Sequence, residues 1–291
     1  MTEVDIDHLR SWIGRTQEKS DTVSPRLVES INAIFNASSG LAPGDPAPLG
    51  IHWCLAPDIA PTSALGPDGH PARGDFLPPV PLPRRMWAGG QVEFSGDFRV
   101  GDNVTRRSRI DNVTEKTGRS GALVFVTVRH DYLTSRGVVL TERQDIVYRD
   151  QETKSTARPD GETQARPTAE PTVADHSREI DASATLLFRY SALTFNGHRI
   201  HYDLHYATQV EHYPGLVFHG PLQATYLMRL AAETSTRALR AFSYRSVAPL
   251  FAGGTVSIHA TNRPDGIELW TADGQRNPTM KAAATCVPTT N

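Results

Sequence analysis

Cysteine, long apolar runs and net charge are all scarce in this chain. Its two cysteines, Cys54 and Cys286, are far apart and in no CxxC spacing, so they form neither a disulfide framework nor a zinc knuckle. No apolar run approaches the ~20 residues that a membrane span requires, and the polar start MTEVDIDHLRSWIGRT is unlike a secretory signal. A formal charge of -2 gives no signature for nucleic acid or an anionic membrane. We therefore expect a cytoplasmic protein with neither as its partner.

The length of the chain allows one large domain or two ordinary ones. It has 291 residues, of which 38% are hydrophobic, and its 21 prolines and 22 glycines indicate many loops. The stretch DQETKSTARPDGETQARPTAEPTVADHS (150–177) is nearly free of large apolar side chains, so it cannot bury enough surface to offset its ordering entropy. The sequence therefore predicts a linker at 150–177 between an N-terminal unit (1–149) and a C-terminal unit (178–291).

The two predicted units resemble each other. Runs rich in Val, Ile, Thr and Tyr follow Gly101, with TEKTGRSG and TSRG between them, and similar runs follow Gly253, with NRPDG and DGQRN between them. Such runs separated by turn residues are typical of antiparallel strands joined in a meander. The segments FRVGDNV and LFAGGTV then mark corresponding points of the two units.

One helix is predicted before each meander. In SPRLVESINAIFN (24–36) a capping serine and a proline precede an apolar stripe, and HGPLQATYLMRLAAETSTRAL (219–239) has a proline in its first turn. The combination favours an α+β fold in which each sheet wraps its own helix and edge strands join into one continuous sheet. The Pro/Gly-rich stretch from GLAPGDPAPLG to FLPPVPLPRR (40–85) is too long for an ordinary loop, and it is predicted to form a lid or pocket wall.

The stretch NGHRIHYDLHYATQVEHYPGLVFHGPL (196–222) resembles a known motif. MaoC-like (R)-specific enoyl-CoA hydratases of hotdog fold carry D-x-N-P-x-H-x-D-x-x-x-A, followed by a block that ends in His-Gly. The residues assigned to these blocks are His201, Asp203, Ala207, Gly215, His219 and Gly220. Without gaps, the asparagine of the motif falls on His198 and its catalytic aspartate on Asn196. With SALTFNGHRIHYD and PLPRRMWAGG, this departure resembles the double-hotdog branch that acts on mesaconyl-C4-CoA and itaconyl-CoA, and the related hydroxyacyl-thioester dehydratases.

The resemblance implies a double hotdog fold and the reversible hydration of an α,β-unsaturated acyl-CoA, with a C5 dicarboxylic acyl group favoured. This chemistry requires a positioned water, a general base and donors to the thioester oxygen. The resemblance makes His201 the base, while Asn196 could orient the water and His198 could act as a second polar partner or relay. Gly220 opens the second predicted helix, so its N–H suits the thioester oxygen. The N-terminal unit carries no such block and would supply a pocket wall.

Basic residues are required if the substrate is a CoA ester, because coenzyme A carries three phosphate groups. Arg84, Arg85 and Arg245 are the candidates for these phosphates or for a substrate carboxylate. The scattered glycines match no Rossmann or phosphate-loop context, so we expect no cofactor beyond the CoA of the substrate. A homodimer of such chains is compatible with the fold.

Other interpretations stay open at this point. His198, His201 and His205 stand at i, i+3 and i+7, the spacing of a helical metal site, although no HExxH or two-His-plus-carboxylate pattern accompanies them. We expect no metal, and we expect His205 and His212 at the surface. Asn196 could be a turn residue before Gly197. The alternatives in function are a 3-hydroxyacyl-thioester dehydratase for fatty-acyl chains and a thioester-binding protein without turnover.

Overall fold

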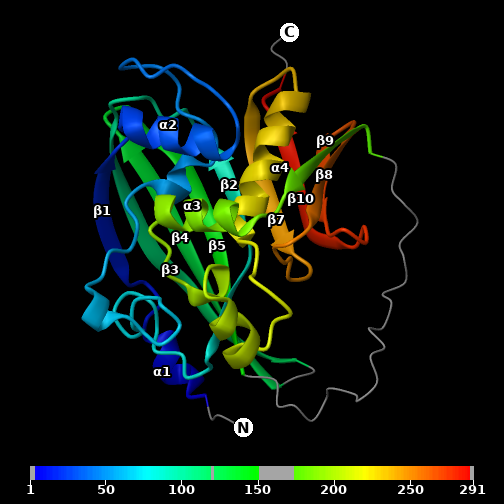
Figure 1. Ribbon diagram of the computed structural model, residues 1–291. Coiled ribbons are helices and arrows are strands. Elements are labelled where there is room, and N and C mark those ends of the chain that lie inside the picture. Colours follow the sequence, from blue (N-terminus) through cyan, green and yellow to red (C-terminus); the bar gives the residue numbers. More distant parts are fainter. Residues whose placement is uncertain (1–3, 119–120, 151–173, 289–291) are drawn as a thin grey trace.

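The computed structural model describes residues 4–118, 121–150 and 174–288, and their ten strands form one antiparallel sheet (Figure 1). The N-terminal half contributes β1 (Thr16–Thr22), β2 (Arg84–Phe94), β3 (Asn103–Gly118), β4 (Gly121–Thr134) and β5 (Gly137–Arg149). The C-terminal half contributes β6 (His176–Asp181), β7 (Leu239–Ser246), β8 (Thr255–Arg263), β9 (Gly266–Ala272) and β10 (Pro278–Cys286). Their order is β1-β3-β4-β5-β2-β7-β10-β9-β8-β6. Both predicted meanders, β3–β5 and β8–β10, are confirmed.

Within the sheet, the two halves join where β2 pairs with β7. Val92 and Phe242 face each other across this seam, and neither side chain is exposed to solvent. The predicted union of two edge strands is confirmed, and it removes two edges that would otherwise expose unpaired N–H and C=O groups.

The internal repeat is visible in the backbone. Gly101 (φ +93°) and Gly253 (φ +97°) both adopt the left-handed region that favours glycine. The N–H of Gly101 donates to the carbonyl of Val23 at 2.8 Å, and that of Gly253 donates to the carbonyl of Ala182 at 3.0 Å. The predicted correspondence of FRVGDNV and LFAGGTV is therefore confirmed.

The helices differ in part from the prediction. The predicted α2 (Pro25–Ile34) and α4 (Gly220–Thr234) are present, and α1 (Ile6–Arg10) and α3 (Ala184–Leu193) are additional. In the N-terminal half, α2 follows β1 and has Ser24 as its N-cap. In the C-terminal half, α3 follows β6 and has Ser183 as its N-cap. The counterpart of α2 is therefore α3 rather than α4. Before β2 the chain has the short 3₁₀ turns η1 (Ile51–Cys54) and η2 (Thr62–Ala64) instead of a long helix.

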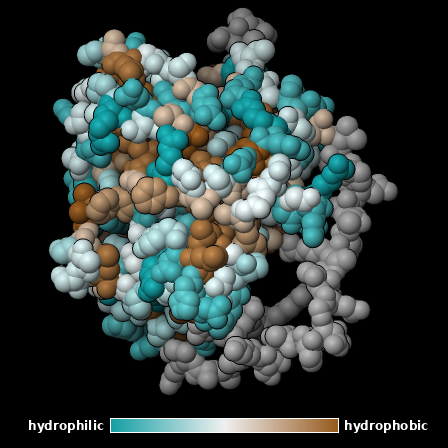
Figure 2. Space-filling view, in the orientation of Figure 1, coloured by the Kyte–Doolittle hydropathy of each residue, from teal (hydrophilic) through white to brown (hydrophobic). Residues whose placement is uncertain are grey.

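The core lies between the sheet and the helices on one of its faces (Figure 1). α4 packs on β7–β10 and buries Leu222, Leu227 and Met228 completely, and each such side chain contributes roughly 1.5–3 kcal/mol by leaving water. On the outside, polar groups surround separate apolar ones (Figure 2), and Phe188 and Leu204 are among the exposed apolar residues. Among the described residues, no helix has both the length and the apolarity to cross a membrane.

Most of the predicted linker lies outside the described residues. His176 and Ser177, which the prediction assigns to the linker, instead begin β6 and pair with β8. The error has a physical reason: β6 is an edge strand in which only Ile180 is buried, so its composition resembles that of a linker.

Candidate active site

His201 lies in a short turn between α3 and α4, at the end of η4 (Arg199–His201). Its Nδ1 lies 2.7 Å from the carbonyl oxygen of Val217, and because a carbonyl can only accept, Nδ1 donates and Nε2 of the neutral ring keeps its lone pair. Burial lowers the pKa of His201 to about 4. At neutral pH the ring is therefore uncharged, which is the state that a general base requires.

His219, at the start of α4, supports the ring of His201. The two rings are stacked with their centroids 3.6 Å apart and 19° between their planes. Nε2 of His219 lies 2.8 Å from Oγ of Ser191 on α3, and burial lowers the pKa of His219 well below its ordinary value. These contacts make His219 a structural support for the ring of His201 rather than a second base.

His198 contacts two other histidines. Its ring centroid lies 5.4 Å from that of His201 and 4.2 Å from that of His70, and burial lowers its pKa far below the usual range. Asn196, which the sequence suggested as a water-orienting group, instead holds this loop, because its Oδ1 accepts the N–H of His198 at 3.0 Å. The geometry favours the alternative of a turn residue.

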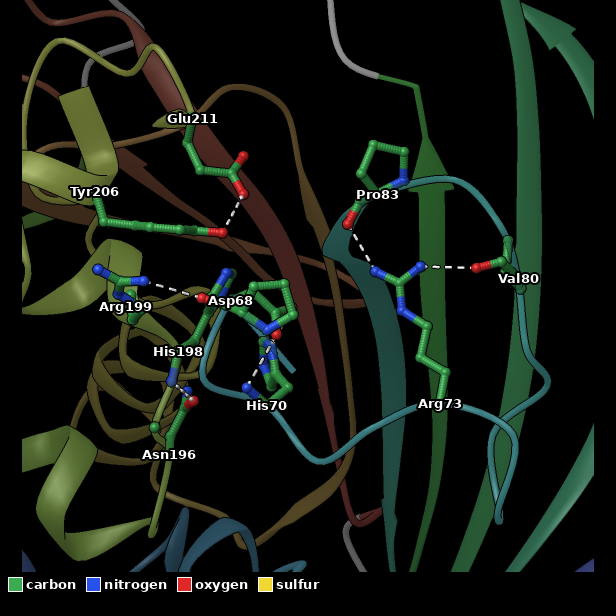
Figure 3. Close-up of polar contacts among 12 residues, drawn as sticks. Asp68, His70, Arg73, Val80, Pro83, Asn196, His198, Arg199, Tyr206 and Glu211 are labelled. Carbon is green, nitrogen blue, oxygen red and sulfur yellow. Dashed lines mark hydrogen bonds and ion pairs between the residues drawn. The ribbon is translucent and has the colours of Figure 1, made fainter. Parts of the chain in front are cut away.

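The Pro/Gly-rich stretch brings Asp68 and His70 to this loop (Figure 3). Oδ2 of Asp68 lies 3.0 Å from Nδ1 of His70, and both side chains are mostly buried. Sequence reasoning missed this pair, although the DGH triplet within a predicted pocket wall was a usable signal. The stretch does line the site, as expected.

Two arginines fix the stretch in place. Arg199 follows His198 in the chain. Its backbone N–H donates to the carbonyl of Asp68 at 2.9 Å, and its guanidinium Nη1 donates to the carbonyl of Pro67 at 3.1 Å. Arg73 donates to the carbonyls of Val80 and Pro83 ahead of β2, at 2.7 and 2.6 Å (Figure 3). His70 therefore sits between two anchored points.

A metal ion could fit at one point of the site. One donor atom each from Asp68, His70 and His198 lies within 4.8 Å of the others, so the premise that no carboxylate accompanies the histidines is wrong. The charge of Arg85 opposes a bound cation here. Burial, and after it the charge of Arg85, lowers the pKa of His70 to about 4. Burial alone would raise the pKa of Asp68, but the hydrogen bonds from His70 and the charge of Arg85 lower it to about 2.

The metal site considered from the sequence spacing does not form. η4 is a single 3₁₀ turn, and His205 is exposed whereas His198 and His201 are buried, so the three do not share a helix face. His212 is exposed as expected. Asp203 accepts the N–H of Tyr206, the first residue of the following turn η5 (Tyr206–Val210), at 2.9 Å.

The three candidate arginines have different surroundings. Arg84 is buried with its Nε 3.2 Å from Oε2 of Glu211, so its charge already has a partner within the protein, which disfavours a role in binding the substrate. Arg245 is exposed next to Tyr244, which is buried against Trp87 on the helix side of the sheet. Neighbouring strand residues point to opposite faces, so the structure places Arg245 on the face away from the helices. Arg85 is the candidate whose charge acts on the histidines.

Gly220 is the first residue of α4, directly after His219. A Cβ atom there would lie 2.8 Å from Cε3 of Trp87, so only glycine allows this approach. Its N–H belongs to the first helical turn, which has no acceptor within the helix. That the N–H of Gly220 donates to the thioester oxygen of the substrate stays a prediction.

Comparison with known proteins places the chain in a family. Residues 50–252 match the model of the family described as hydroxyacyl-thioester dehydratase type 2. The chain belongs to this hydroxyacyl-thioester dehydratase family. It is also 42% identical over 261 residues to the mesaconyl-C(4)-CoA hydratase of Chloroflexus aurantiacus, an alignment that covers 89% of this chain and 91% of the relative.

Solved structures show the same fold at low sequence identity. A MaoC-like dehydratase from Phytophthora capsici superposes with a TM-score of 0.68 at 14% identity, over 99% of this chain and 100% of that one. A Mycobacterium tuberculosis protein described as having a double hotdog fold superposes with a TM-score of 0.55 at 12% identity, over 94% of this chain and 96% of that one. The double hotdog fold expected for this dehydratase-family chain is confirmed.

Proposed function

We propose that the protein catalyses the reversible addition of water to the double bond of an α,β-unsaturated acyl-CoA. The observation that carries this proposal is His201, which occupies the motif position and has Nδ1 engaged by Val217 and Nε2 available as an acceptor. The 42% identity to a mesaconyl-C(4)-CoA hydratase supports a C5 dicarboxylic acyl group, as in mesaconyl-C4-CoA or itaconyl-CoA. The CoA of the substrate is the only cofactor in this proposal.

The proposed reaction assigns a separate task to each part of the site. Nε2 of His201 accepts a proton from water as the water oxygen bonds to Cβ. Negative charge then develops on the thioester oxygen, where the N–H of Gly220 and the start of α4 stabilise it. Arg85 is half-buried and its charge acts on His70 and His198, so it suits the distal carboxylate of the acyl group.

A second candidate follows from the family description. Dehydration of a 3-hydroxyacyl thioester is the same reaction in reverse, and the family is described by that activity. Acyl chain preference separates the two candidates, since a fatty chain has no carboxylate for Arg85. The cytoplasmic location and the homodimer remain predictions.

The test is a panel of enoyl-CoA substrates, in which hydration is measured as the loss of enoyl-thioester absorbance. A charged hydrogen bond is worth about 1.5–3 kcal/mol, so we expect kcat/KM roughly 10–100-fold higher for mesaconyl-C4-CoA or itaconyl-CoA than for crotonyl-CoA. Arg85→Met should remove this difference, whereas Arg189→Met, an exposed arginine of α3, should keep it. Preference for long apolar chains would favour the dehydratase, and binding without turnover would contradict both.

A further inference from the structure

In a hydration reaction, both O–H groups of the attacking water need an acceptor. While one proton leaves for the base, the other O–H must point at an acceptor so that the oxygen lone pair faces Cβ. The motif that this chain resembles has an aspartate where this chain has Asn196. The oxygen of Asn196 is held in the turn by the N–H of His198, and an amide lacks the negative charge of the aspartate in the motif, so a neighbouring side chain is the better candidate for the second acceptor.

We propose that His70, oriented by Asp68, is this second acceptor and a catalytic residue supplied by the N-terminal half. The inference rests on the proposed hydratase function and adds to it a residue outside the motif. Asp68 acts as a positioning residue, because it contacts the imidazole of His70 rather than the reacting water.

The geometry of the pair supports this use. A carboxylate can only accept, so the 3.0 Å contact makes Nδ1 of His70 the donor to Asp68 and leaves Nε2 with its lone pair. The ring of His70 contacts that of His198, which contacts that of His201, and the charge of His70 acts on His201. Two imidazoles with bound Nδ1 atoms, those of His70 and His201, are therefore both in contact with His198.

The chemical step balances without any further reactant. Nε2 of His201 takes one proton of the water as the C–O bond forms at Cβ and the π electrons move toward the thioester carbonyl. Nε2 of His70 accepts the hydrogen bond from the remaining O–H, which becomes the product hydroxyl. His201 then gives its proton to Cα, so one water has been added and both histidines are neutral again.

A divalent cation is the competing use of Asp68, His70 and His198. Two observations favour the acceptor role. The one carboxylate of the group is already hydrogen-bonded to the ring nitrogen of its neighbour, as in an oriented catalytic histidine. The charge of Arg85 acts on Asp68, His70 and His198 and opposes a cation.

The experiment compares kcat and KM of His70→Ala, His70→Asn and Asp68→Asn with those of the wild-type chain on mesaconyl-C4-CoA and crotonyl-CoA. We expect both His70 variants to lose ~10²-fold or more in kcat on both substrates, with KM changed less than about threefold. Added imidazole should restore part of the activity of His70→Ala, because it can refill the vacated position. Asp68→Asn should lower kcat by about tenfold, since the amide no longer fixes the tautomer.

Asp45→Asn is the matched control. Asp45 lies in the same stretch and caps a turn by accepting the N–H of Ala42 at 2.8 Å, so the loss of this charge should leave kcat unchanged. A wild-type chain inactive on every enoyl-CoA would defeat the proposed function itself. Normal kcat in both His70 variants of an active enzyme would overturn only the present inference. Loss of wild-type activity to EDTA, with recovery on adding Zn²⁺, would overturn it in favour of a metal site.

Discussion

Gly69 and Gly197 pack backbone against backbone, each directly before a histidine of the site. A Cβ atom on Gly69 would lie 2.0 Å from the carbonyl oxygen of Gly197, and one on Gly197 would lie 2.7 Å from that of Gly69. This contact sets the spacing of His70 and His198, whose ring centroids are 4.2 Å apart. The two halves of the chain therefore meet within the site itself.

Gly69→Ala should separate the two loops. We expect kcat to fall by about 10²-fold, because a displacement of about 1 Å within a catalytic group can have that effect. Gly44→Ala is the control, since Gly44 has a similar φ (+92° against +88°) but open space around its Cβ position. Both variants acquire backbone strain, so equal losses of kcat would show that the contact with Gly197 is unimportant.

His201→Ala should lower kcat by ~10²–10⁴-fold with a modest change in KM, because a general base contributes about that factor. Circular dichroism and a thermal melt should show a folded chain. His205→Ala changes an exposed histidine four residues away and should keep full activity. A His201→Ala enzyme with near-normal kcat on every substrate would make these histidines structural.

Asn196→Asp should fold normally, because a carboxylate oxygen can accept the N–H of His198 as the amide does. The new charge should retain or raise activity on crotonyl-CoA if the site works like its Asp/His relatives. Activity on mesaconyl-C4-CoA should be lost selectively if the substrate carboxylate lies near position 196, since like charges repel. Equal effects on both substrates would place that carboxylate elsewhere.

Arg84→Met should destabilise the fold. Removal of one partner from a buried ion pair costs about 3–5 kcal/mol, and without Arg84 the buried carboxyl of Glu211, whose pKa burial already raises, loses its ion-pair partner. The double variant Arg84→Met, Glu211→Leu should recover much of the loss. Arg178→Met, which breaks an exposed pair with Glu233, should cost less than about 1 kcal/mol. Urea unfolding measures the stability of all three variants. An Arg84→Met chain as stable as the wild type would refute the stabilising role of the Arg84–Glu211 ion pair.

Acid should weaken the fold over the pH range in which the histidines of the unfolded chain take up protons. Burial lowers the pKa of His52 to about 3 and those of His130 and His201 to about 4. Between pH 6.5 and 4 these histidines bind protons in the unfolded chain but not in the folded one, so each lowers the free energy of unfolding as the pH falls, by up to about 1.4 kcal/mol per pH unit. The carboxyl of Glu142, whose pKa burial raises to about 7, acts in the opposite direction and offsets one of these protons. Urea midpoints at pH 7.5 and 5 test this, and His130→Gln should reduce the slope. A midpoint independent of pH would contradict the neutral burial of these rings.

The sequence predicts the repeated parts of the fold well. The meanders and the glycine steps at Gly101 and Gly253 follow from local turn chemistry and alternation, which the sheet preserves. The edge strands β1 and β6 were missed because their residues are largely exposed and show no apolar face. α3 was missed because it buries little apolar surface of its own.

The site residues that lie in one short segment of the chain could be predicted from the sequence. His198 and His201 are close in sequence, so a motif could name them. Asp68 and His70 are more than 120 positions earlier, and only the packing of two loops brings them to His198. Long-range contact of this kind has no local pattern, and the pairing of Arg84 with Glu211 was missed for the same reason.

The seam between β2 and β7 also constrains how the protein can be made. Each half offers the other a bare strand edge, with Val92 on one side and Phe242 on the other. A half synthesised alone would expose that edge and invite aggregation, whereas two separate chains, broken within 151–173 and produced together, have the complementary edges to assemble. The molecule is thus suited to use as a split reporter, whose activity would return only when both pieces meet.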